Sequence, residues 1–376
     1  MNNNILETYK GVFELTKYYL FPDNTKIDYS KYKLTIGEWD NILFHARIHG
    51  LYSFVAQSII NISKEVEIPK QTKINCSLQL EKREKRYNKI VDLIKEIGRK
   101  LKAENTNMLI LKGLSISKMY KTPYMRDFGD LDCYLMGNYE VLHNIFEKEG
   151  IKIKGKKHKH SSCYYKKLSI ENHRNILNID IYNIEKSIQQ TLLEINKETE
   201  ENPKLIFEND IEHNNIYAPT ANFNAIYLLR HSLSHFIAGN MPFKHLTDWA
   251  MFLQLEYDNI NKEKIKDLYN KFNMERVAGA FCYLCVNYIG MDSKYSLYSN
   301  YNDYAEFAEK ILLTTIESNL LAQQKSPGGL KHIMFKWKRL KRQSVPYEVL
   351  YGKGFWREKA KNTIIAYIKS PNKMLD

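Results

Sequence analysis

The chain has 376 residues, of which 44% are hydrophobic and 26% charged, as is typical of a soluble globular protein with one or two domains. Its formal net charge of +13 favours association with anionic partners and does not indicate the fold. No basic segment followed by an apolar run opens the sequence, and the longest apolar stretch, Val277–Ile289, is too short to span a bilayer, so we expect neither a secretory signal nor a transmembrane segment. Five cysteines form no disulfide framework, and Cys282-x-x-Cys285 lacks the second pair that zinc needs, so we expect a cytoplasmic protein.

Helical periodicity dominates residues 1–104, which we expect to form an N-terminal helical region. Residues 105–185 mix strand and helix patterns and indicate an α/β core. Helical periodicity returns over 186–324, and Ser326-Pro-Gly-Gly329 is a candidate linker to a basic, aromatic-rich tail, 325–376. The elements expected in the core are a strand at 108–111, a helix at 114–120, a loop at 121–129, a strand at 130–135, a helix at 138–148 and strands near 162–168 and 176–182.

Two acids, Asp130 and Asp132, begin an alternating run. Because residues i and i+2 of a strand point to one face, their carboxylates would project together. Such carboxylates repel each other, and a hard dication such as Mg²⁺ relieves the repulsion. A third acid, Asp180, lies among apolar residues of the last expected strand, where an acid is unusual. The three acids predict a divalent-metal site, although an isolated Asp-x-Asp can also be a pair of solvated loop acids or a helix cap.

The segment before these acids suits a phosphate. An apolar strand runs into Lys112-Gly113 and then into the expected helix, so a glycine turn and a helix N-terminus meet there. Lys112 would neutralise a phosphate or brace the acids, unless it forms a salt bridge with Asp127 or Asp130. Arg126 could clamp a phosphate through two hydrogen bonds, or equally order its loop by pairing with an acid.

These features together resemble the uncharacterised bacterial branch of the polymerase-beta-like nucleotidyltransferases, over roughly residues 35 to 290. That branch has Lys-Gly where the superfamily usually has Gly-Ser, an Arg shortly before Gly-Asp-x-Asp, and a later third acid. The branch often has His two residues after the third acid, and here Tyr182 holds that position, so the acceptor or its geometry could differ. The residues that carry the resemblance are Lys112, Gly113, Tyr120, Arg126, Asp130, Asp132 and Asp180, with further marks at His49-Gly50-Leu51, His160, His235 and Asp248.

The resemblance implies an α+β fold, with a small mixed-sheet nucleotidyltransferase core between helical regions. It implies an enzyme that moves a nucleoside monophosphate from an NTP, with ATP as the expected nucleotide, to a small molecule, a glycan or lipid precursor, a peptide or a protein. Mg²⁺ or Mn²⁺ would be held by the three acids. The residues implied to contact the nucleotide are Lys112, Gly113, Arg126 and His160, and those implied to support them from behind are His235 and Asp248, unless the histidines are only structural.

Two other functions stay open. A catalytically degenerate nucleotide-binding or scaffold protein would act through the basic tail, but the complete set of acids argues against it. An RNA-modifying nucleotidyltransferase or another nucleic-acid-binding protein is the second alternative, although the sequence has no recognised helix-turn-helix, zinc-finger or RRM signature.

The tail carries most of the excess charge. From Lys325 to Asp376 there are 13 Lys and Arg residues against 3 Asp and Glu residues. Aromatic residues lie among them at Phe335, Trp337, Phe355 and Trp356. This segment could bind a membrane surface or another anionic partner, or it could be a solvated basic face.

Overall fold

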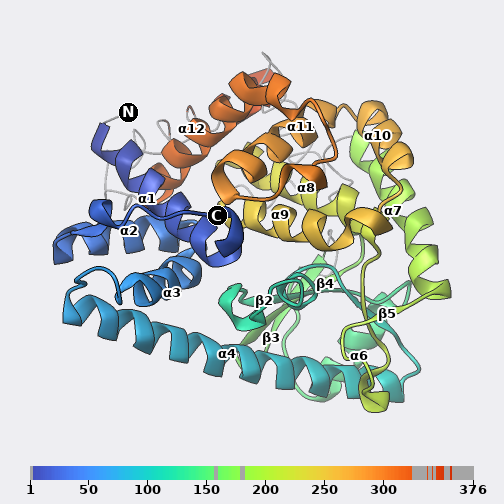
Figure 1. The fold of residues 1–376 in the computed structure, drawn as a ribbon. Coiled ribbons are helices and arrows are strands. Elements are labelled where there is room, and N and C mark those ends of the chain that lie inside the picture. The colour runs from blue at the N-terminus through green and yellow to red at the C-terminus, as the bar shows by residue number, and fades with distance from the viewer. Residues whose placement is uncertain are drawn as a thin grey trace.

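The computed structural model describes residues 3–155, 160–177 and 183–323, together with 337, 341, 344–350 and 356–357. In these residues a six-stranded sheet lies between one long helix, α4 (Lys70–Ala103), and a large group of helices (Figure 1). The fold is therefore α+β, which confirms the predicted class.

Three helices precede α4, namely α1 (Asn3–Leu20), α2 (Ile36–Ile48) and α3 (Tyr52–Ile62). Helix α2 begins at a capping box: the Thr35 hydroxyl accepts a hydrogen bond from the Glu38 N–H, and the Glu38 carboxylate accepts one from the Thr35 N–H. Helix α4 lies along one face of the sheet because its apolar residues recur at helical spacing. A hydrophobic core fills the space between α4 and the sheet. The residues that α4 contributes to it are Ile90, Leu93, Ile94, Ile97 and Leu101.

The sheet has the strand order β3-β4-β2-β1-β6-β5. Strand β2 pairs antiparallel with β1 and parallel with β4, while β1 also pairs parallel with β6. Side chains alternate between the faces: Met108 and Ile110 pack towards α4, whereas Leu109 packs in the core of the helical half. The strands are β1 (Met108–Ile110), β2 (Asp130–Tyr134), β3 (His160–Tyr165), β4 (Leu168–His173), β5 (Lys204–Leu205) and β6 (Ile216–Ala218), and the helices among them are α5 (Leu114–Ser117), α6 (Tyr139–Lys148) and α7 (Asn183–Glu201).

Part of the sheet differs from its prediction. A β3–β4 hairpin spans 160–173, and it turns at Lys166 and Lys167, both with positive φ. Such turns usually contain Asn or Gly, so this one left no recognisable signal in the sequence. The expected strand near 176–182 begins in a bend at 176–177, and its remainder, including Asp180 and Tyr182, lies outside the described residues. The segment expected to be helical after 186 contributes β5 and β6, which are too short to show alternation.

The remaining helices share one core with α1–α3. That core extends from Tyr9 to Ile316, so the first and last helical segments pack as one body. The π-helix Cys285–Ile289 contacts both α1 and α9. No helix in the described ranges combines the length and apolarity needed to cross a membrane. These later helices are α8 (Ala221–Ile237), α9 (Lys244–Glu256), α10 (Lys262–Lys271), α11 (Glu275–Leu284) and α12 (Ala305–Ala322).

The structure places the five cysteines and part of the basic tail. All five cysteines are buried and free. Of the tail, Val349 and Leu350 pack on the core, while Trp337 and Trp356 are exposed and lie against each other with ring centroids 5.8 Å apart. Phe335, Phe355 and most of the tail lie outside the described residues.

The N-terminal helices also support the start of α9. His49 follows α2, and its ring stacks on Phe243 with centroids 4.1 Å apart. Burial lowers the pKa of His49 to about 3, so the ring is neutral at pH 7. The Lys244 N–H donates to the His49 carbonyl. Next to it, Gly50 has φ +71°, and a Cβ there would lie 2.8 Å from Cδ of Lys244.

We predict that Gly50→Ala destabilises the protein more than Gly150→Ala. Both glycines have a left-handed φ, +71° and +73°, but a Cβ at Gly150 would meet nothing within 4 Å. Each substitution should cost about 1–2 kcal/mol for the backbone conformation. Gly50→Ala should cost about 1–3 kcal/mol more because it crowds Lys244. Urea unfolding measures both free energies. Equal losses of stability would show that the Lys244 side chain moves away from the added Cβ at no cost.

Candidate active site

Two neighbouring strands inside the sheet bring three carboxylates together on one of its faces, and this group of acids is called the carboxylate edge below. Asp130 and Asp132 point to the same face of β2 because they are two residues apart. In the parallel β2–β4 register, Asp132 stands opposite Glu171. Asp132 is buried, whereas the side chain of Asp130 is 39% exposed and reaches the pocket described below. Among the described residues, the third carboxylate at this edge is Glu171, which the sequence analysis did not select.

Lys112 lies between the carboxylates. Its Nζ is 2.9 Å from Asp132 Oδ2 and 3.7 Å from Asp130 Oδ2. The first contact is what the bracing role predicts, and the second is the salt bridge with Asp130 that was the alternative, so the functional role of Lys112 stays a prediction. Gly113 follows with φ +70°, and a Cβ there would lie 3.3 Å from the Asp130 carbonyl oxygen. Helix α5 has only four residues, fewer than predicted, so it builds up little of the helix dipole expected to attract a phosphate.

Burial and charge act against each other in this group. Burial lowers the pKa of Lys112, but the charges of Asp132 and Asp130 outweigh it and raise that pKa above its ordinary value. Burial likewise raises the pKa of Asp132, but a hydrogen bond from His173 and the Lys112 charge hold it below the usual range. Burial and the charge of Asp132 raise the pKa of Glu171 to about 7, against the opposing effect of Lys112. One lysine therefore does not compensate all three acids.

Two histidines border the carboxylates. Nε2 of His173 lies 3.2 Å from Asp132 Oδ1, and its Nδ1 lies 3.3 Å from the Asn175 carbonyl oxygen. Nε2 of His160 lies 3.7 Å from Oε2 of Glu171. His160, predicted to contact the nucleotide, is thus placed beside the acids.

The Glu171-Asn-His173 spacing is a signal that the sequence analysis missed. It has the pattern of an acid followed two residues later by His, which the family resemblance led us to expect at Asp180. There, Tyr182 stands in place of the His. In the structure this pattern lies on β4, next to Asp132. Asp180 lies outside the described residues, so its role as a metal ligand stays a prediction.

Arg126 forms a buried ion pair with Asp248. Its Nε donates to Asp248 Oδ1 at 2.9 Å and its Nη2 donates to Oδ2 at 2.6 Å. The Tyr120 hydroxyl donates to the same Oδ1 at 2.8 Å. Burial lowers the pKa of Arg126, but Asp248 outweighs it and raises that pKa. The bidentate geometry predicted for a phosphate is occupied by Asp248, which favours the ordering role of Arg126.

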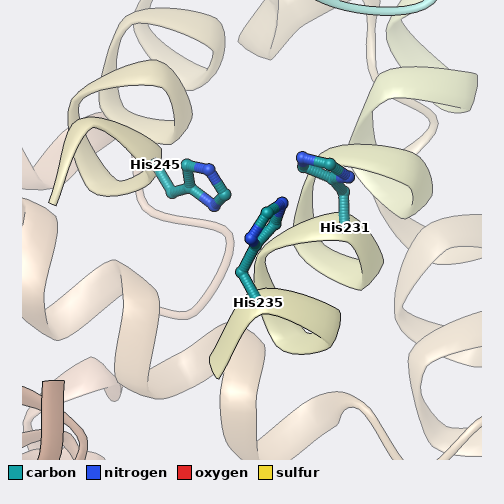
Figure 2. Close-up of side chains that lie close together, drawn as sticks. All are labelled: His231, His235 and His245. Carbon is teal, nitrogen blue, oxygen red and sulfur yellow. The ribbon is translucent and has the colours of Figure 1, made fainter. Parts of the chain in front are cut away.

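A pocket of about 220 Å³ lies between the carboxylate edge and helices α8 and α9. His235, predicted to support the site, is on its wall with His231 and His245. Figure 2 shows the three rings facing a common space, two from α8 and one from the start of α9. The lining residues are Lys112, Gly113, Arg126, Phe128, Asp130, Leu228, His231, Ser232, His235, Asn240, Pro242, Lys244, His245 and Asp248.

The model of a family described as uncharacterised nucleotidyltransferase matches residues 37–290. The chain belongs to this family. The match covers both the carboxylate edge and the pocket, and it confirms the family resemblance and the assignment as a nucleotidyltransferase enzyme. Neither the curated proteins nor the solved structures give a match.

In this nucleotidyltransferase, we predict that Asp248→Ala costs about 3–5 kcal/mol of stability, because it leaves the Arg126 guanidinium buried without its carboxylate. Glu306→Ala breaks the exposed pair with Lys310 and should cost no more than about 1 kcal/mol. Urea unfolding measures both.

A double variant controls for the loss of packing. Arg126→Met with Asp248→Leu removes both charges and should recover much of the loss. If Asp248→Ala proves as mild as Glu306→Ala, the pair does not hold the loop to α9.

Proposed function

We propose that this nucleotidyltransferase moves a nucleoside monophosphate from an NTP to an acceptor, and that Asp130, Asp132 and Glu171 hold the divalent metal ion. The observation that carries the proposal is the position of these acids on adjacent parallel strands, next to a pocket that also contains Lys112. Asp180 stays a predicted further ligand.

The donor set fits Mg²⁺ or Mn²⁺, because hard dications prefer carboxylate oxygens. Oδ2 of Asp132 is buried and accepts no well-aligned hydrogen bond, although the Lys112 ammonium lies 2.9 Å away. The raised pKa of Glu171 indicates that the acids are short of positive charge. When bound, such an ion coordinates phosphate oxygens and neutralises the charge that develops as pyrophosphate leaves.

The surrounding residues would position the nucleotide. Lys112 reaches the pocket and can contact a phosphate while it stays near Asp132. Gly113 lets the backbone approach the phosphates because it has no side chain. His173 holds the Asp132 carboxylate from behind and so fixes its orientation.

The pocket limits what can be enclosed. Its volume of about 220 Å³ is below the roughly 300–1,000 Å³ of sites that enclose a whole small ligand. It therefore suits phosphates or part of an acceptor rather than a complete nucleotide. We propose ATP as the nucleotide, and a small molecule, a glycan or lipid precursor, a peptide or a protein as the acceptor.

We predict that ATP or another NTP raises the melting temperature when Mg²⁺ is present. Ligand at about 100 times its Kd adds about 2.7 kcal/mol of stability. Asp130→Asn with Asp132→Asn should abolish the shift, and Glu171→Gln should reduce it, each measured against the same variant without nucleotide. Glu140→Gln is the control, because Glu140 is an exposed carboxylate that pairs with Arg174.

The third ligand is tested in the same assay. If Asp180→Asn removes the shift while Glu171→Gln keeps it, Asp180 and not Glu171 completes the site. If none of the four common NTPs shifts the wild-type protein at millimolar concentration, the degenerate-scaffold alternative gains support.

A further inference from the structure

The described residues contain three groups of side chains that could hold a metal ion. His160, Glu171 and His173 belong to the carboxylate edge already discussed. Asp210, Glu212 and His213 are engaged elsewhere: Asp210 pairs with Lys95 and with His213 itself, and Glu212 pairs with Arg99. The third group contains only imidazoles, His231, His235 and His245, and it lies on the wall of the pocket described above.

The geometry of the three imidazoles is close to that of a metal site. His231 and His235 are four residues apart on α8, so they share one face of the helix. His245 joins them from the first turn of α9, and the three ring centroids lie 4.6 to 5.3 Å apart. One nitrogen from each ring lies within 4.8 Å of the others. A tetrahedral ion with bonds of about 2.0–2.1 Å places its ligands about 3.4 Å apart, a distance that small ring rotations can reach.

His245 supplies a second observation. It is buried, and its Nδ1 has no hydrogen-bond partner. A buried polar nitrogen without a partner is costly, and a metal ion would satisfy it. Burial, together with the neighbouring charges of His235 and Lys244, lowers the pKa of His245 well below its ordinary value.

The charges around the pocket allow a cation at this place. Lys244, Lys112 and Arg126 all bring positive charge near His245. Lys112 pairs with Asp132 and Arg126 pairs with Asp248, whose carboxylate also acts on Lys244. Their net repulsion of a bound ion is therefore reduced. Imidazole nitrogens without a carboxylate favour zinc-class ions over the Mg²⁺ expected at the acids.

We infer that His231, His235 and His245 bind a transition-metal ion of the zinc class, separate from the ion held by Asp130 and Asp132. Three protein ligands leave a fourth position open, as in catalytic rather than structural zinc sites. Because all three histidines line the pocket, that position faces the same space as Asp130. An anionic oxygen of the nucleotide or the acceptor can occupy it. The inference goes beyond the proposed nucleotidyl transfer and does not depend on it.

The test uses the full chain, stripped of metal with a chelator and titrated with Zn²⁺ and with Co²⁺. We expect one equivalent of zinc at this site and visible cobalt bands of a four-coordinate complex. His231→Ala and His235→Ala should each weaken zinc binding by more than the about 10–100-fold typical of losing an outer partner. Both positions are only half-buried, so these variants should fold. His245→Asn is added with a circular dichroism check of folding.

Two control variants test whether the metal ion is held by the three histidines and not elsewhere. His45→Ala removes a buried histidine outside the three groups and should leave the cobalt spectrum unchanged. Asp130→Asn with Asp132→Asn should also keep the zinc stoichiometry, even though it abolishes the response to NTP and Mg²⁺. The inference is overturned if the wild-type chain binds neither ion, or if the spectrum survives loss of both His231 and His235. It is equally overturned if the spectrum disappears in the Asp130/Asp132 variant, because the ion then sits at the carboxylate edge.

Discussion

The ion pair between Arg126 and Asp248 connects the two halves of this enzyme. Arg126 comes from the loop that leads into β2, and Asp248 comes from α9 in the helical half. Both side chains are buried, so each would be costly without the other. Both residues line the pocket, so the pair lies where the carboxylate edge meets the helices that carry the histidines.

The parallel pairing of β2 and β4 provides the other constraint on the site. It sets Glu171 beside Asp132, with Lys112 on the same acids. Like charges are thereby concentrated on one face of the sheet, around the buried Asp132, which is unfavourable for folding alone. Such an arrangement is typical of functional sites, and it lies within the part of the chain that matches the nucleotidyltransferase family.

The sequence predicted those parts of the site that depend on local spacing. Asp130 and Asp132 were found because strand residues two apart share a face, and Lys112-Gly113 because a strand ends there. Glu171 was missed because its closeness to Asp132 arises from pairing between strands far apart in sequence, which no local pattern records. The partner of Arg126 was left open for the same reason, since Asp248 lies 122 residues away. The turn at Lys166-Lys167 has no glycine or asparagine to mark it, so the hairpin was misplaced.

The shared core of the first and last helices also bears on how the protein is made. Phe13 of α1 packs against Tyr288, and Lys17 donates a hydrogen bond to the Asn287 carbonyl. During synthesis on the ribosome, α1 emerges long before these partners exist. The part of α1 that meets them stays uncovered until more than two thirds of the chain has been translated, whereas α2 and α3, which also pack on α1, follow it directly. The contacts that join the N-terminal helices to the last helical segment therefore form late in synthesis, after the strands that carry the acids have been translated.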